Sequence, residues 1–252
     1  MDLGLSGRIA LVTGGAAGIG EAIARALAIE GCLVSIADRD GAAAERAASG
    51  LVAEGLQARS VALDVGDPSA VAAAFERLHR AEGGLDILVN GAGILSTGPV
   101  AEVGVSEWEE VVRVNLSGVL YCARAAIPLM AARGRGRIVN IASVSAMRGG
   151  GSIGNVLYGT SKAGVVALTM GLARELGPNR ITVNAVAPAV VETAMTRSKL
   201  TEEMRQRITA RIPLGRLASA SDIADLVAFL ASDRASFITG AVIPVDGGIL
   251  TT

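Results

Sequence analysis

Short, β-branched apolar runs alternate with alanine-rich segments of helical periodicity along the whole chain. The apolar runs lack polar alternation, which is typical of parallel strands that are buried on both faces. The alternation predicts a doubly wound α/β fold, in which helices cover both faces of a parallel sheet. The predicted strands are Arg8–Thr13, Leu33–Ala37, Ala58–Leu63, Ile87–Asn90, Arg137–Ala142, Arg180–Ala185 and Ala241–Val245.

The helical segments have recognisable ends. Asp67 followed by Pro68 is typical of a helix N-cap and its first helical residue. Gly31, Gly55 and Gly177 stand where C-terminal caps belong. No linker or repeat divides the 252 residues, so we predict one domain over 1–252. The predicted helices are Ile19–Glu30, Ala42–Glu54, Ser69–Ala81, Ser106–Ala132, Tyr158–Leu176, Glu202–Ile212 and Asp222–Ala231.

Charge and composition exclude several classes of partner. The net charge is −1 and no long run of Lys and Arg occurs, so we expect no nucleic-acid partner. The apolar stretches are interrupted by charged or polar residues, so we expect no membrane span. Asp2 and the lack of a basic start argue against a secretory signal. The isolated Cys32 and Cys122 suit a reducing compartment, and we predict a cytoplasmic protein.

The chain has a single histidine, His79, and it lies in an ordinary amphipathic helical pattern. A Ser-His-Asp hydrolase or a zinc site of Cys and His ligands would have to use it without any motif spacing, so we expect no metal. Acid–base chemistry must therefore come from Asp, Glu, Lys, or one of the two tyrosines, Tyr121 and Tyr158.

A glycine string joins the first predicted strand to the first helix, Thr13-Gly14-Gly15-Ala16-Ala17-Gly18-Ile19-Gly20. Glycines let backbone N–H groups approach a pyrophosphate, and a helix N-terminus favours an anion. At this place in the fold the string predicts a dinucleotide site rather than a plain turn. We predict that Asp38, at the end of the second strand, is an acceptor for the adenosine ribose hydroxyls. The alternatives are an exposed turn residue or a cap of the helix that begins near Gly41.

Tyr158 and Lys162 are four residues apart on a predicted helix and so share a face. A neighbouring ammonium favours the phenolate, so we predict that Lys162 lowers the pKa of Tyr158. Ser143 leaves the end of a buried strand, where ligands bind in open α/β sheets. Asn115 lies inside an apolar helix and needs partners there. It either bonds to the backbone as a structural residue or holds a water in a proton path.

Together these motifs resemble the classical short-chain dehydrogenase/reductase family nearly end to end. The glycine string, Leu63-Asp64-Val65, Asn90-Gly91-Ala92-Gly93 and Pro188 to Thr193 resemble the family's cofactor segments. The resemblance assigns Asn115, Ser143, Tyr158 and Lys162 as the catalytic tetrad. It assigns to the cofactor Gly14, Ala17, Gly18, Ile19, Gly20, Asp38, Asp64, Val65, Asn90, Tyr158, Lys162, Pro188, Val191 and Thr193.

The chain departs from the family pattern at three places. Gly91 replaces an Asn, and Ala189 replaces the Gly after Pro188, so the backbone at Ala189 should keep a negative φ. Ser143 lies 15 residues before Tyr158, which is two more than usual, whereas Ser145 has the usual spacing. We choose Ser143, because its place after the strand matches and the glycine-rich loop that follows can absorb two residues.

The resemblance implies a single Rossmann-like domain with about seven parallel strands, commonly assembled as a homotetramer. It implies an oxidoreductase that transfers a hydride between a nicotinamide cofactor and a secondary alcohol or ketone, such as a sugar, polyol or small hydroxy compound. Tyr158 would act as the acid/base, Ser143 would orient the oxygen, and Lys162 would hold the nicotinamide ribose. The alternatives are a 3-oxoacyl thioester reductase and a non-catalytic dinucleotide sensor on the same fold.

Two further expectations concern specificity. Asp38 and the lack of a basic residue at position 17, which is Ala17, predict NAD as the cofactor. NAD in turn favours oxidation of an alcohol as the physiological direction. The opposing feature is Arg39, which lies next to Asp38 and could bind a 2′-phosphate. We expect residues 190–213 to form a lid over the substrate. Basic residues outnumber acidic ones in it and Arg148 lies nearby, which suits either an anionic or polyhydroxylated substrate or an ordinary solvated helix.

Overall fold

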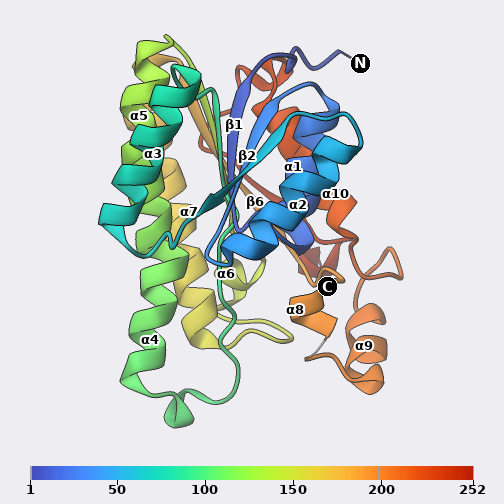
Figure 1. Ribbon diagram of the computed structural model, residues 1–252. Helices are drawn as coiled ribbons and strands as arrows, with labels where there is room; N and C mark the ends of the chain where they lie inside the picture. Colours follow the sequence, from blue (N-terminus) through green and yellow to red (C-terminus); the bar gives the residue numbers. More distant parts are fainter. Residues whose placement is uncertain (1, 198, 252) are drawn as a thin grey trace.

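The computed structural model describes residues 2–197 and 199–251. It contains one parallel sheet with the strand order β3-β2-β1-β4-β5-β6-β7, and helices cover both of its faces (Figure 1). The predicted doubly wound α/β fold is therefore confirmed. The strands are β1 (Ile9–Thr13), β2 (Leu33–Asp38), β3 (Ala58–Ala62), β4 (Ile87–Asn90), β5 (Gly136–Ile141), β6 (Ile181–Pro188) and β7 (Val242–Val245).

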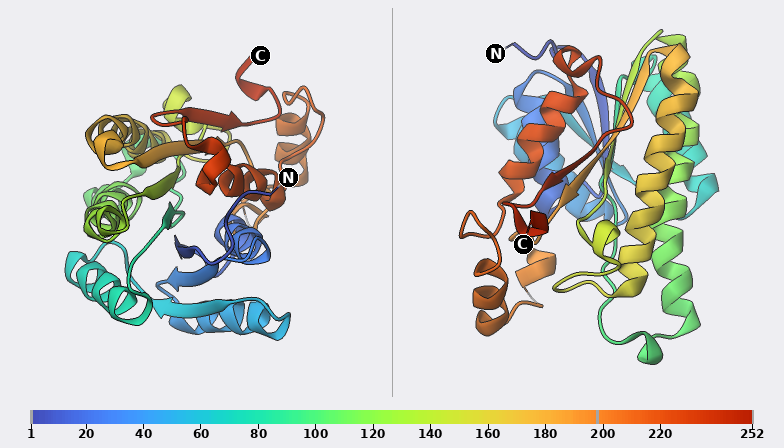
Figure 2. Two further views of the ribbon diagram at one scale, coloured as in Figure 1. Left: turned by 90° about the horizontal axis from the view of Figure 1, so that it is seen from above. Right: turned by 180° about the vertical axis from the view of Figure 1, so that it is seen from behind.

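Alternate residues of each central strand pack into different cores. Val12 of β1 joins an apolar cluster with α1 (Gly18–Ile29) and α10 (Ala220–Ala231). Leu11 faces the opposite cluster, with α3 (Pro68–Glu82) and α5 (Gly118–Ala132). Two buried faces explain why the strands show no polar alternation. Figure 2 shows the two helix layers, α1, α2 (Gly41–Ala53) and α10 on one side, and α3, α5 and α7 (Val156–Leu176) on the other.

One predicted helix is interrupted. The sequence predicts a single helix over Ser106–Ala132, but the structure has α4 (Val105–Val112), a π-helical turn over Arg113–Ser117, and then α5. π-turns insert one residue into a helix and are common at functional sites. Asn115 lies inside this turn. The continuous apolar pattern carries no sign of it.

Several predicted boundaries shift. The strand β6 runs to Pro188 rather than Ala185, which brings the chain directly to the predicted site. Gly177 does not adopt the left-handed cap conformation, because a 3₁₀ turn over Gly177–Asn179 continues the helix. Arg180 takes that conformation instead, with φ 58°. Ala189 is absent from the positive-φ residues of the described chain, as expected. The short helices are α6 (Ser145–Arg148), α8 (Ala194–Arg197), α9 (Glu202–Thr209) and 3₁₀ turns at Val100–Glu102, Asp233–Ala235 and Ile249–Thr251.

The order of the strands reverses direction between β1 and β4. In open parallel sheets, ligands bind at such a switch point, outside the carboxyl ends of the strands. The loops after β1, β4 and β5 all leave from that edge, and α8 and α9 lie at the same end of the molecule (Figure 1). The topology therefore gathers the predicted motifs at one place.

Two helical stretches, Val105–Ala132 and Val156–Asn179, are long and apolar enough to cross a membrane by length and composition alone. Both pack against the sheet, and 44% of each apolar window is buried inside the protein. Core helices of this kind meet the same length and composition test.

Candidate functional site

Three adjoining cavities form a continuous cleft along the carboxyl edge of the sheet. An outer cavity between Arg39, Asp64 and Val114 shares Gly14, Asp38, Gly93 and Ile94 with a central one. The central cavity in turn shares Ile19, Ile141, Tyr158 and Thr193 with an inner cavity beneath α6. The cleft thus runs from the end of β2, past the glycine turn, to Tyr158 and Ser143.

The glycine turn is packed so closely that side chains would not fit. A Cβ on Gly14, which has φ +64°, would lie 2.7 Å from the Cα of Ala92, and a Cβ on Gly20 would lie 2.0 Å from the carbonyl oxygen of Gly14. The residue before α1, Ala17, offers no side-chain cap to the first N–H groups of the helix. Uncapped donors at a helix N-terminus that lines a cavity suit a pyrophosphate, so the turn fits a dinucleotide.

Asp38 lines both the outer and the central cavity. Its carboxylate accepts hydrogen bonds from the backbone N–H of Ala16 at 3.3 Å and of Asp40 at 3.1 Å. It is Asp40, not Asp38, that caps α2, by accepting from the Ala43 N–H at 3.0 Å. The alternative role of Asp38 as a helix cap is therefore wrong, and its carboxylate lies at the wall of the cleft.

Asp64 and Val65 line the outer cavity, and Asp64 is held there by charge. Arg113 Nη1 donates to Asp64 Oδ2 at 3.0 Å, and the Gly66 N–H donates to Oδ1 at 2.9 Å. Burial raises the pKa of Asp64, but these two donors lower it by more, so the net pKa lies below its usual value. Asp64 is thus an ionised acceptor at the outer end of the cleft.

Asn90 lies below the cleft and not in its wall. Its side chain is 2% exposed, and its Nδ2 donates to Asn140 Oδ1 at 2.8 Å on the neighbouring strand. The segment that follows is fixed by Thr13, whose Oγ1 accepts from the N–H groups of Gly91 at 3.1 Å and Ala92 at 3.3 Å. Asn90 therefore supports the turn over Gly91 and Gly93, which do line the central cavity.

Pro188, Val191 and Thr193 form the opposite wall. Pro188 ends β6, and its carbonyl accepts from the Val144 N–H at 3.0 Å. Val191 forms an isolated bridge with Ala218, and Thr193 lines both the central and the inner cavity. A Cβ on Gly18 would lie 3.2 Å from Thr193 Cγ2, so this segment closes directly over the glycine turn.

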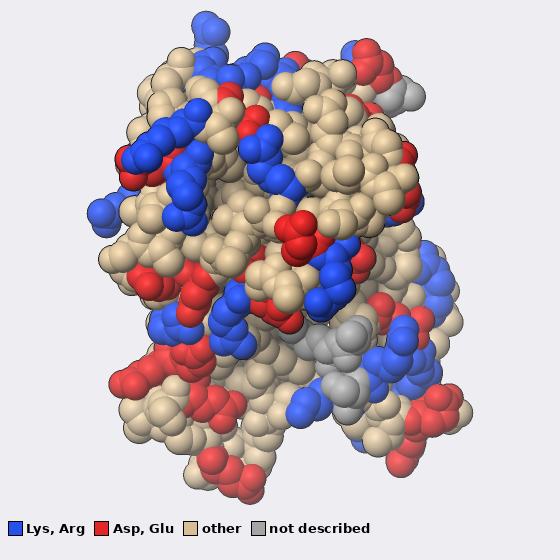
Figure 3. Space-filling model, in the orientation of Figure 1, with Lys and Arg blue, Asp and Glu red and all other residues tan. Residues whose placement is uncertain are grey.

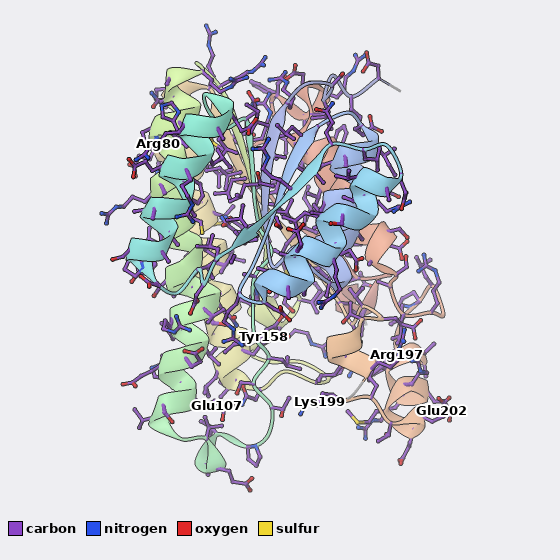
Figure 4. All side chains as sticks on the ribbon, viewed as in Figure 1. Arg80, Glu107, Tyr158, Arg197, Lys199 and Glu202 are labelled. Carbon is purple, nitrogen blue, oxygen red and sulfur yellow. The ribbon has the colours of Figure 1, made fainter. Side chains whose placement is uncertain are left out.

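Tyr158, Ser143 and Lys162 meet where the central and inner cavities join. Tyr158 lies just beyond the carboxyl ends of the strands (Figure 4), and its hydroxyl is hydrogen-bonded to Ser143. Lys162 Nζ lies 5.8 Å from the centroid of the Tyr158 ring and donates to the Ile141 carbonyl at 2.7 Å. The structure therefore brings the phenol, the hydroxyl and the ammonium into one place.

Ser143 and Ser145 differ in what they contact. Ser143 Oγ accepts from the Ser145 N–H at 3.1 Å and bonds to Tyr158. Ser145 begins α6, and its Oγ lies 2.7 Å from where a Cβ on Gly151 would stand. The glycine loop thus folds back on Ser145 and absorbs the longer spacing, which supports the choice of Ser143.

The pKa prediction for Tyr158 is wrong for this arrangement. Burial raises the pKa of Tyr158, and the Ser143 hydroxyl, rather than Lys162, is the group that lowers it. The reason is geometric, because the Lys162 ammonium is turned toward the Ile141 carbonyl. Burial also lowers the pKa of Lys162 itself to about 8.

This burial gives a prediction for stability. Between pH 8 and about 10.4 the unfolded chain binds the Lys162 proton more tightly than the folded chain, so folding stability rises with pH across that window. Removal of the ammonium from water destabilises the folded state by roughly 3 kcal/mol at pH 7, as its lowered pKa implies. Its hydrogen bond to the Ile141 carbonyl stabilises the folded state by only about 1 kcal/mol. We therefore expect Lys162→Met to be more stable than the wild type by roughly 1–2 kcal/mol at pH 7.

Denaturant titrations at pH 7 and pH 10.5 check this prediction. The advantage of Lys162→Met should disappear at the higher pH, where the lysine is neutral in the folded state and about half deprotonated in the unfolded chain. The chain's other lysine, Lys199, is exposed, so Lys199→Met serves as the control and should leave stability unchanged at both pH values. An advantage that persists or grows at pH 10.5 would contradict the assignment.

Asn115 connects the loop after β4 to α7 by hydrogen bonds. Its Nδ2 donates to the Ile94 carbonyl at 2.9 Å and to Ser161 Oγ at 3.1 Å, and its Oδ1 accepts from the Ile94 N–H at 2.8 Å. The side chain is fully buried. These bonds connect the loop after β4 to the helix that carries Tyr158. Asn115 therefore has the structural role that was one of its two predicted roles. A Cβ on Gly93 would lie 3.3 Å from Asn115 Oδ1 and 3.5 Å from Lys162 Nζ, which leaves Asn115 next to the ammonium.

Asn155, which was not among the predicted site residues, fixes the start of α7. Its side chain accepts from the N–H groups of Leu157 at 3.1 Å and Tyr158 at 3.2 Å, and its Nδ2 donates to Ser96 Oγ at 2.7 Å. Ser96 in turn bonds to Glu107 of α4 at 2.6 Å. The signal was available, because Asn is a favoured N-cap residue directly before a helical pattern.

Comparison with known proteins agrees with this geometry. A family model described as enoyl-(acyl carrier protein) reductase matches residues 14–250. A 3-oxoacyl-[acyl-carrier-protein] reductase of Aquifex aeolicus is 41% identical over 250 residues, which cover 99% of this chain and 100% of the relative. The meso-2,3-butanediol dehydrogenase of Serratia marcescens is 39% identical over 241 residues, or 96% of this chain and 94% of the relative.

Solved structures show the same fold. A candidate NAD(P)-dependent gluconate 5-dehydrogenase from Beutenbergia cavernae, with NADP bound at low occupancy, superposes with a TM-score of 0.94 and 39% identity, and the match covers 100% of both chains. Fold, cleft and relatives lead to one conclusion: the chain belongs to the short-chain dehydrogenase/reductase family of oxidoreductases.

Proposed function

We propose that the protein transfers a hydride reversibly between NAD(H) and a secondary alcohol or ketone, with Tyr158 as the general acid/base. The observation that carries this proposal is the meeting of Tyr158, Ser143 and Lys162 at the junction of the glycine-lined cleft and the inner cavity. The glycine turn fits a dinucleotide, since it lines the central cavity at the N-terminus of α1, which has no side-chain cap. When bound, the nicotinamide supplies or accepts the hydride.

The residues around the carbinol carbon have separate roles in this proposal. Tyr158 takes the hydroxyl proton of an alcohol or returns it to a ketone, and Ser143 donates to the same oxygen to orient it. Lys162 Nζ lies 5.8 Å from the centroid of the Tyr158 ring, and Lys162 also lines the central cavity, where a nicotinamide ribose would lie. Asn115 holds the Ile94 loop and α7 together, so it fixes the position of Tyr158.

Three observations support NAD rather than NADP as the cofactor. The Asp38 carboxylate lines the cleft where a ribose would lie, and Ala17 provides no cation. Arg39 lies 3.9 Å from Glu110 across the outer cavity, so its charge already faces an acid. The NADP bound to the Beutenbergia cavernae protein is the opposing consideration.

The proposed substrates are a small secondary alcohol, a sugar or a polyol. A second candidate is reduction of a 3-oxoacyl thioester, which is favoured by the apolar lining of the inner cavity, with Leu95, Ile153 and Val190, and by the 3-oxoacyl reductase relative. We further propose that 1–252 acts as one catalytic domain with residues 190–213 as its lid, in a cytoplasmic homotetramer.

A substrate screen with both cofactors tests the proposal. Purified protein is offered secondary alcohols, polyols, hydroxy acids and 3-oxoacyl thioesters, and formation or loss of reduced nicotinamide is followed by absorbance. We expect turnover with at least one class. Tight cofactor binding with no turnover in any class would favour the alternative of a dinucleotide sensor.

A further inference from the structure

The inner cavity contains one charged side chain among the described residues that line it, that of Arg148. Apart from Tyr158, the rest of the lining is apolar or consists of glycine, serine and threonine. Arg148 forms no ion pair with any residue in 2–197 or 199–251. A guanidinium without an acidic partner at the edge of an apolar cavity is a recognition group for an anion that arrives with a ligand.

The fold places the backbone of Arg148 close to Ser145 and to the helix that carries Tyr158. Arg148 ends α6, three residues after Ser145, so the two share a face with their Cβ atoms about 5–6 Å apart. Behind it, a Cβ on Gly159 would lie 2.5 Å from the Gly150 nitrogen. The loop that follows Arg148 thus presses directly on α7, the helix that carries Tyr158. The backbone at Arg148 is therefore held beside the helix that carries Tyr158, and the exposed side chain extends from this place to the edge of the cavity.

The lid does not supply an equivalent group. None of its arginines is among the described residues that line the inner cavity. Arg205 is ion-paired with Glu192 and Glu202. Arg197, Lys199 and Glu202 lie at the same end of the molecule as Tyr158 (Figure 4). On the face in Figure 3 acidic and basic side chains are interspersed. At the inner cavity, by contrast, Arg148 is the one charged side chain among the described residues that form the lining.

Resting on the proposed function, we infer that the natural substrate carries a carboxylate or phosphate a few bonds from its carbinol carbon, and that Arg148 binds this anion. The carbinol oxygen of this substrate bonds to Tyr158 and Ser143, and its anionic group pairs with Arg148. The part of the substrate between these two groups is apolar and contacts the apolar lining of the cavity. A polyol fits less well, because its hydroxyl groups would find few polar side chains in this lining.

Matched substrates test this inference. The acids are lactate, 3-hydroxybutanoate and 4-hydroxypentanoate, and each is paired with its neutral methyl ester. 3-Hydroxybutyl phosphate distinguishes a phosphate from a carboxylate. We expect wild-type kcat/KM to favour at least one anion over its neutral counterpart by about 10-fold or more. Arg148→Gln should remove that preference by raising KM, with kcat changed less than about 3-fold. Arg148→Lys should restore it in part.

Two controls separate the possible failures. Arg124 is also exposed, but it lies on α5 and away from the cavity, so Arg124→Gln should leave all constants unchanged. Calorimetry of 3-hydroxybutanoate with wild type and Arg148→Gln measures anion binding without turnover. Esters oxidised as well as acids, or equal KM values in wild type and Arg148→Gln, would overturn the inference while the proposed function stands. Anion binding that depends on Arg148, without turnover of any substrate, would support the anion site and refute the proposed function.

Discussion

Tyr158→Phe should lower kcat by roughly 10²–10⁴-fold and leave the dissociation constant of the cofactor unchanged. The substitution removes one oxygen from a ring that stays packed against Gly154, where a Cβ would lie 2.6 Å from Tyr158 Cδ1. Without the hydroxyl, the carbinol proton has no acceptor at this position, and Ser143 loses its partner. Steady-state kinetics and a cofactor titration of the same preparation give the two quantities.

The chain contains its own control for this prediction. Tyr121, the other tyrosine, packs half-buried against the core on α5, away from the cleft. Tyr121→Phe should keep wild-type turnover within about 2-fold, since it removes a hydroxyl of the same kind outside the site. If Tyr158→Phe retains more than a few per cent of turnover while it binds cofactor normally, the assigned role is wrong.

The second large effect concerns the choice of cofactor. We expect wild-type kcat/KM to favour NAD over NADP by at least about 100-fold, or about 2.7 kcal/mol. A 2′-phosphate beside Asp38 would bring two negative charges against a third, and each like-charge pair costs roughly 3–4 kcal/mol at about 4–5 Å and an effective dielectric near 20. Asp38→Ser should reduce the preference to about 10-fold or less.

Asp40→Ser provides the comparison. Asp40 is two residues away and caps α2, but it does not line the described cleft. Its replacement should cost about 1 kcal/mol of stability or less and leave the ratio of kcat/KM values for the two cofactors unchanged. Comparable efficiency with NADP in the wild type would refute NAD as the cofactor. An unchanged ratio in Asp38→Ser would show that another residue sets the preference.

The fold could be predicted because its signals are local. The first four residues of β1 are apolar and all five are buried, as a strand covered on both sides requires. The glycine turn was predictable for a similar reason. Gly14 and Gly20 stand where the main chain approaches itself too closely for any side chain, and the sequence shows that restriction directly.

The unpredicted features depend on contacts between distant segments. The π-turn at Asn115 accompanies bonds to Ile94 and Ser161, which are 21 and 46 residues away. The direction of the Lys162 side chain depends on the Ile141 carbonyl, which no i,i+4 pattern reveals. Burial then raises the pKa of Tyr158, which is opposite to the expected shift. Asn90 faces a neighbouring strand because Asn140 is its register partner. A motif alone cannot distinguish this support from a direct cofactor contact.

The central claim is that a hydride moves between a carbinol carbon and the nicotinamide. The most direct measurement uses an alcohol found in the substrate screen and labelled with deuterium at the carbinol carbon. We predict that mass spectrometry of the cofactor after one turnover finds one deuterium in the reduced nicotinamide, and that the single-turnover rate falls relative to the unlabelled alcohol. Reduced cofactor without deuterium, or label released to water, would contradict the account.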